Sequence, residues 1–167
     1  MSKRIVVKGD MTINGESGSY CELQSNRVDN QHVTANTGHR HFVLYQLGKL
    51  TLNYLKLTWG EAGSEHGGFI KMELKSTLVI NWVHFDGTET TGPHGSDGGC
   101  ISVGNGETVK IKKSTFEGCR ASQRGGAINV QKTLNPMTIE STTFKNNEAG
   151  VRFNIRRHSL KLYFRLI

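Results

Sequence analysis

The residues of this chain that could do acid–base chemistry are spread around one loop, Thr88–Asp97, which contains Pro93-His94-Gly95-Ser96-Asp97. Carboxylates beside imidazole and guanidinium groups are the residue types that cleave polysaccharides. Such reactions use two carboxylates about 5 to 9.5 Å apart, or carboxylate-bound Ca²⁺ with a basic residue. The candidate groups are Glu65, His66, Asp86, His94, Asp97 and Arg124.

Other signatures of these reactions are missing from the sequence. The loop lacks the paired aspartates and the Gly-His-Gly and Arg-Ile-Lys motifs of polygalacturonases, and the chain has no Gly-Gly-x-Gly-x-Asp calcium repeat and no Cys/His metal spacing. We therefore assign no catalytic residue, no metal ligand and no cofactor. A polysaccharide lyase or hydrolase with a site near Thr88–Asp97 is the alternative function, and it depends on fold analogy alone.

The elements that would position these groups form an internal repeat. A Gly-Gly pair followed by an apolar dipeptide occurs three times, at intervals of 31 and 27 residues. Repetition with a period of this size indicates a solenoid. The pairs are Gly67-Gly68, Gly98-Gly99 and Gly125-Gly126.

A second repeated segment alternates with the glycine pairs. Its eight residues are mostly apolar at positions one, three, six and eight, as in the copies 50–57, 78–85, 109–116 and 137–144. Alternation with period two predicts a strand, and the two adjacent polar positions in the middle predict a bend with both side chains outward. Three inward rows are expected: Leu52, Ile80, Ile111 and Ile139; Leu57, Phe85, Phe116 and Phe144; and Ile70, Ile101 and Ile128.

The predicted fold class is all-β, a right-handed single-stranded parallel β-helix. No helical series of apolar residues persists beyond one turn, and the loops are too short for crossover helices. Successive turns should stack at about 4.8 Å, and parallel crossovers are almost always right-handed. We expect an N-terminal cap or irregular first turn over residues 1–40, repeats over 41–150 and a basic, apolar terminal strand or tail over 151–167.

Two tetrapeptides carry a family resemblance. Gly125-Gly126-Ala127-Ile128 and Phe144-Lys145-Asn146-Asn147 resemble the GGAI and FxxN repeats of chlamydial polymorphic outer membrane proteins and related adhesin-like β-helices. The resemblance covers roughly residues 37 to 150, and only one copy of each motif is literal.

This resemblance implies a pectin-lyase-like solenoid displayed on the cell surface or outside the cell and used in attachment, without catalysis. It also implies that the chain is a fragment of a larger protein. Its partners would be a glycan or a protein surface, and further β-helix turns of a larger chain or assembly. The repeat-structural residues would be the six paired glycines, the row Leu57, Phe85, Phe116 and Phe144, and Asn147.

Two outward rows are candidate contact sites. Tyr54, Trp82, Lys113 and Ser141 occupy the bend position, and the row must face outward because a buried Lys113 would be costly. Exposed aromatic rings suit a sugar or a protein partner, unless a loop or the N-terminal segment covers them. The residues before the glycine pairs, His66, Asp97 and Arg124, should form a charged row, either an exposed set of ion pairs or a functional site.

Charge and cysteine content exclude several classes. Of the formal net charge of +7, five positive charges lie after residue 150, so the remainder carries about +2 and no nucleic-acid partner is expected. Contact of the basic tail with a membrane is a minor alternative. No apolar run is long enough for a signal peptide core or a membrane span. The three cysteines, Cys21, Cys100 and Cys119, are expected to be buried small hydrophobic residues without a disulfide framework.

Overall fold

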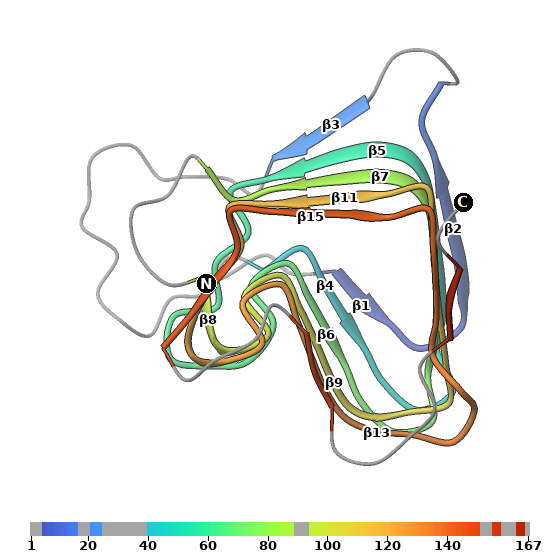
Figure 1. Cartoon of the computed structure of the whole chain (residues 1–167). Helices are drawn as coiled ribbons and strands as arrows, with labels where there is room; N and C mark the ends of the chain where they lie inside the picture. The colour runs from blue at the N-terminus through green and yellow to red at the C-terminus, as the bar shows by residue number, and fades with distance from the viewer. Residues whose placement is uncertain are drawn as a thin grey trace.

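The computed structural model describes residues 5–16, 21–24, 40–88, 94–150, 155–157 and 163–165, with the side chains of 23–24 and of the last two ranges left out. Every regular element in this part of the chain is a β-strand. The strands run parallel and stack as a β-helix of about four turns, as predicted (Figure 1).

The first sheet contains one short strand from each turn. Its members pair in parallel and in strict sequence order, so that each strand lies on the equivalent strand of the preceding turn. In order they are β1 (Ile5–Val7), β4 (Phe42–Leu44), β6 (Ile70–Met72), β9 (Ile101–Gly106), β13 (Ile128–Thr133) and β17 (Ile155–Arg157).

The second sheet contains the eight-residue segments of the repeat. In two turns the segment is one long strand that passes through the bend, and in the other turns it is divided there. The strands are β2 (Asp10–Asn14), β3 (Cys21–Gln24), β5 (Lys49–Thr58), β7 (Thr77–Asp86), β10 (Thr108–Lys112), β11 (Thr115–Glu117), β14 (Thr138–Glu140), β15 (Thr143–Lys145) and β18 (Tyr163–Arg165).

The third sheet is small and forms a separate part of each turn. It consists of β8 (Gly95–Asp97), β12 (Arg120–Arg124) and β16 (Glu148–Ala149). Figure 1 shows it beside the main coil, where the chain leaves the second sheet and before it enters the first. We call this part of the molecule the lobe.

The three predicted inward rows are confirmed. Register pairs join each member to its equivalent in the next turn, for example Leu52 to Ile80 and Ile70 to Ile101. The aromatic rings of Phe85, Phe116 and Phe144 stack along the coil axis, with centroids 4.5 and 5.1 Å apart. All members are buried except Phe144, which is partly buried at the last of these turns.

A left-handed backbone conformation produces the bend, and the sequence pattern did not predict it. The residue at the bend adopts a left-handed conformation in four successive turns, with φ of 56° at Tyr54, 56° at Trp82, 48° at Lys113 and 48° at Ser141. Each non-glycine residue there costs about 1–2 kcal/mol. This conformation turns the strand through a corner while its flanking residues keep the inward and outward alternation.

The two glycines of each pair have different roles. The first has a positive φ, 70° at Gly67, 66° at Gly98 and 64° at Gly125, which glycine adopts without steric cost. The second allows close approach between turns, because a Cβ on Gly99 would overlap the carbonyl oxygen of Gly126 and lie 2.6 Å from the backbone of Arg120.

The cysteine prediction was right about the burial of Cys100 and Cys119 and wrong about the burial of Cys21 and the absence of a disulfide. Cys100 and Cys119 are buried but form a disulfide with a Cα–Cα distance of 5.5 Å, and Cys21 is exposed. In the linear repeat the two bonded positions belong to different rows. The lobe brings them together, because one cysteine lies where the chain enters the lobe and the other where it leaves. No helix in the described residues is long and apolar enough to cross a membrane.

Candidate functional site

We call the outward row Tyr54, Trp82, Lys113 and Ser141 the bend row, and its first three members stack on the outside of the coil. The rings of Tyr54 and Trp82 are nearly parallel, at 13°, with centroids 6.1 Å apart. Lys113 places its ammonium nitrogen 4.6 Å from the centroid of the Trp82 ring. Trp82 is 40% exposed and Lys113 is exposed, so the predicted outward direction of this row is confirmed.

The stacking determines which part of the Trp82 ring is open to solvent. Tyr54 belongs to the turn before Trp82 and Lys113 to the turn after it, so they lie against opposite faces of the indole. From the sequence, the flat faces of the rings were expected to contact a sugar or a protein partner. In the structure Tyr54 and Lys113 partly cover the two faces of Trp82, so the ring edge is the part that the stack leaves uncovered.

A ladder of amide side chains lies beside the stack, one residue earlier in each strand. Asn53 donates from Nδ2 to Oδ1 of Asn14 (2.8 Å), and Asn81 donates in the same way to Asn53 (2.9 Å). In the next turn the row continues with Lys112, which is ion-paired with Glu140 at 3.0 Å. We call the outward side of β2, β10, β14 and the N-terminal halves of β5 and β7 the asparagine face.

The charged row is stacked as predicted, but its centre is not exposed. Asp97 has a side chain with 0% exposure, and Arg124 holds both of its oxygens through a bidentate pair of 2.9 and 2.8 Å. His66 Nδ1 lies 3.6 Å from the same carboxylate. The prediction of an exposed ion-pair row is therefore wrong for Asp97, because the lobe folds the carboxylate into the corner formed by the glycine pairs.

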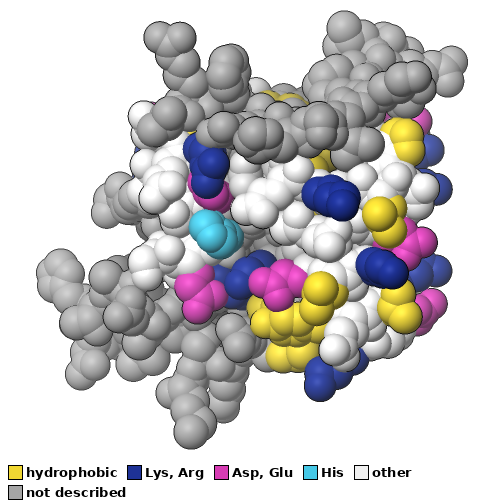
Figure 2. All heavy atoms as spheres, turned by 90° about the horizontal axis from the view of Figure 1, so that it is seen from below, with side chains coloured by type: hydrophobic (Ala, Val, Ile, Leu, Met, Phe, Trp, Pro, Cys, Tyr) yellow, Lys and Arg dark blue, Asp and Glu magenta, His cyan; other side chains and the backbone are white. Residues whose placement is uncertain are grey.

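Arg40 extends this electrostatic column into the preceding turn. It is buried, it pairs with Glu65 at 2.9 Å, and it donates to the carbonyl oxygens of Gly67 and His66. No ion pair or contact role was predicted for Arg40 from the sequence. The face seen in Figure 2 shows the same pairing of signs, with acidic and basic side chains side by side across it.

Both ring nitrogens of His94, a candidate residue of the alternative catalytic site, form hydrogen bonds with the backbone. The N–H of Arg120 donates to Nδ1 (2.9 Å), so Nε2 carries the proton and donates to the carbonyl oxygen of Gly87 (3.1 Å). Burial is the main cause that lowers the pKa of His94 to about 4. Residues 89–93 of the candidate loop lie outside the described residues.

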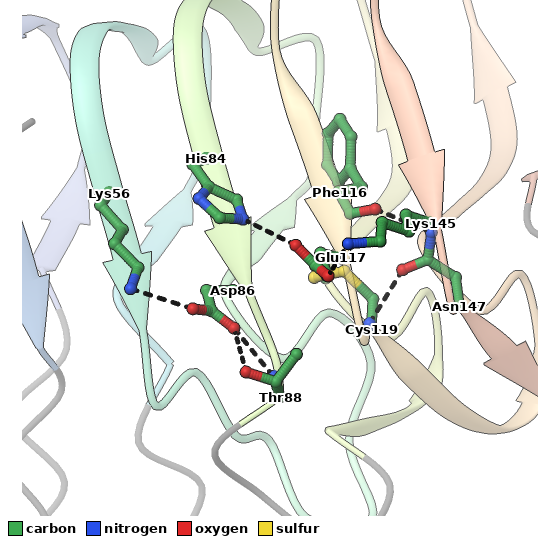
Figure 3. Close-up of polar contacts among 10 residues, drawn as sticks. Lys56, His84, Asp86, Thr88, Phe116, Glu117, Cys119, Lys145 and Asn147 are labelled. Atoms are coloured by element: carbon green, nitrogen blue, oxygen red, sulfur yellow. Dashed lines mark hydrogen bonds and ion pairs between the residues drawn. A yellow bond between two sulfur atoms is a disulfide. The ribbon is translucent and has the colours of Figure 1, made fainter.

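A second polar cluster contains two carboxylates on neighbouring turns, Asp86 and Glu117 (Figure 3). Lys56 pairs with Asp86 at 3.0 Å, and Lys145 pairs with Glu117 at 2.7 Å. The imidazole of His84 lies 3.5 Å from Glu117. Only Asp86 was singled out from the sequence, although the others also occupy outward positions directly beside the predicted Phe row, and this position was the signal available.

Both carboxylates of this cluster are held in their charged form. Burial raises the pKa of Asp86, but hydrogen bonds from Thr88 and Lys56 outweigh it and the pKa lies below its usual value. The hydrogen bond from Lys145 lowers the pKa of Glu117. A glycosidase needs one carboxyl group with a raised pKa as general acid. The arrangement therefore fits an ion-pair network better than an acid–base pair.

Asn147 shows what the FxxN motif does. Its side-chain oxygen accepts a hydrogen bond from the N–H of Cys119 (2.8 Å), and its Nδ2 donates to the carbonyl oxygen of Phe116 (3.0 Å). The side chain thus links two backbone groups of the preceding turn where the regular ladder is interrupted. Within the described residues, no group of three or more His, Cys, Asp or Glu side chains is arranged to hold a metal ion.

Comparisons with protein-family models, with curated proteins and with solved structures found no match to this chain. The parallel β-helix is therefore established by the structure itself. The likeness to adhesin-like repeats depends on the two motifs alone.

Proposed function

We propose that this protein is a non-enzymatic β-helix that attaches to a glycan outside the cytoplasm through the bend row. The observation that carries the proposal is Trp82, which is 40% exposed in the centre of an ordered stack. Large aromatic side chains on a surface mark contact sites more often than chance. The adjoining asparagine ladder offers amide groups at the spacing of the turns, which suits the hydroxyl groups of an extended sugar chain.

Two features support a location outside the cytoplasm. Disulfides persist mainly in oxidising compartments, and Cys100 and Cys119 are joined. The GGAI and FxxN motifs resemble those of surface-displayed β-helices. Contact of the tail with a membrane stays a prediction, because the side chains of residues 151–167 are not described.

A carbohydrate-active enzyme has less support. The groups proposed for it do not converge: His94 bonds the backbone on both ring nitrogens, and Asp97 is neutralised by Arg124. Asp86 belongs to the ion-pair network with Lys56.

Replacing Trp82 with Asn tests the proposal, because Asn accepts the left-handed backbone of the bend. We expect binding on an array of neutral and acidic glycans to fall about tenfold or more, while the free energy of unfolding changes by about 1 kcal/mol or less. Ser141→Asn is the matched control, since it changes the same row at the same backbone conformation without removing a ring.

Unchanged glycan binding by the Trp82 variant would contradict the proposal. A loss of about 3–5 kcal/mol in stability, with binding by the folded fraction intact, would give the ring a structural role. Release of reducing ends from an acidic polysaccharide by the wild-type protein would favour the enzymatic alternative.

A further inference from the structure

The bend row has an electrostatic asymmetry that bears on its ligand. An aromatic ring is negative on its faces and positive at its edge. Lys113 lies over one face of Trp82, and Tyr54 stacks on the other with its ring centroid 6.1 Å away, so that it covers this face in part. The negative faces are thus partly covered within the stack, which leaves the positive edge of the indole uncovered beside an exposed ammonium group.

The lysines of β10 and its bend add positive charge without compensation. Lys110, Lys112 and Lys113 all point outward, and Lys112 pairs with Glu140. Lys110 and Lys113 form no ion pair with any described carboxylate. In the adjacent turns, Lys110 pairs in register with the uncharged residues Val79 and Thr138. The bend residues of the turns before and after Lys113 are Trp82 and Ser141, which are also uncharged. Among the described residues of these turns, Glu140 is the one charged neighbour, and it is paired with Lys112.

Lys110 and Lys113 differ from four other described lysines, which are ion-paired, whereas Lys8, Lys75 and Lys132 also lack an ion pair with a described carboxylate. Lys49, Lys56, Lys71 and Lys145 each lie within 4 Å of a carboxylate, at Asp10, Asp86, Glu73 and Glu117. On the asparagine face the acidic residues are Asp10 and Glu140, and both are already paired. The positive charges of Lys110 and Lys113 are therefore a local excess on this face, and Lys113 lies directly against Trp82.

We propose that the ligand of the bend row is an acidic polysaccharide, a sugar chain that carries carboxylate or sulfate groups. This inference rests on the proposed glycan attachment and adds the charge of the ligand. The polysaccharide lies along the axis of the β-helix. Its anionic groups contact Lys110, Lys113 and the indole edge of Trp82, while its hydroxyl groups exchange hydrogen bonds with the amides of the asparagine ladder.

The test measures binding of the full chain to heparin, hyaluronan and neutral dextran. Heparin carries sulfate and carboxylate, hyaluronan carries carboxylate only, and dextran carries neither. We expect the double variant Lys110→Gln, Lys113→Gln to lose about tenfold in affinity for the acidic chain that binds, since two exposed ion pairs are removed. Lys113→Arg in the Lys110 wild-type background should retain binding. Lys132→Gln removes an exposed lysine of β13 and should change nothing.

Salt and competitor polymers make the result decisive. Binding should weaken as ionic strength rises, because exposed charges are screened. Equal binding of dextran and heparin, lost in the Trp82→Asn variant but not in the lysine variant, would overturn the acidic ligand and keep the glycan function. No binding of any glycan would overturn both. If polyglutamate or single-stranded DNA binds as tightly as heparin and depends on the same lysines, the site is a general polyanion site and the polysaccharide assignment is wrong.

Discussion

At the scale of single residues, buried or partly buried polar side chains replace backbone ladder bonds where the coil is interrupted. His94 joins the end of one turn to the start of the lobe strand in the next. Asn147 does the same beside the disulfide. Such groups stabilise the fold only in one protonation or rotamer state, because an unsatisfied buried partner costs about 1–3 kcal/mol.

The protonation state of His94 should make stability depend on pH. Its folded pKa of about 4 is below the usual histidine value of 6.5, so the unfolded chain binds the proton more readily. The contribution of the neutral ring is present above pH 6.5 and is lost as the pH falls toward 4. We expect about 2 kcal/mol less stability at pH 5 than at pH 7 from this residue, measured by urea denaturation.

The control is His94→Asn, which should be less stable at pH 7 but should lose less stability between pH 7 and pH 5. Burial also lowers the pKa of His41, so His41 also makes the protein less stable as the pH falls. This contribution is present in both the wild type and the His94 variant. An equal loss in the variant and the wild type would show that His94 is not the group responsible.

At the scale of elements, the corner at each glycine pair connects the lobe to the first sheet. The sequence revealed these corners because the pairs repeat, but it did not distinguish the roles of the two glycines. The first needs a positive φ, and the second needs the absence of a Cβ. These are separate requirements, and substitution can test them separately.

Gly99→Ala should destabilise the protein by about 2 kcal/mol or more, although Ala can adopt its φ. The added methyl group would meet backbone atoms of Gly126 and Arg120, which cannot move without shifting a turn. Gly104→Ala is the matched control, because its nearest neighbour is the carbonyl oxygen of Met72 at 3.6 Å. Equal midpoints of thermal unfolding for the two variants would contradict this account of close packing.

At the scale of the whole molecule, the repeat made the fold predictable and the loops made the site hard to predict. Inward rows such as Leu52 to Ile139 follow from period-two alternation, which depends only on neighbouring residues. The burial of Asp97 and the formation of the disulfide depend on how the lobe packs against the two main sheets. The lengths of the loops do not determine this packing. The ring direction of Trp82 depends on side-chain torsions, which no sequence pattern encodes.

The disulfide also has a mechanical consequence for the coil. When the chain is pulled from its ends, turns should detach one after another, since each contacts only its neighbours. The 19-residue separation between Cys100 and Cys119 cannot extend while the bond is intact. Single-molecule pulling should therefore show a contour length about 60 Å shorter for the oxidised protein than for a Cys100→Ala, Cys119→Ala variant. Equal lengths would mean that the two sulfurs are not joined, whereas the shortfall would measure a segment of the coil that tension cannot unravel.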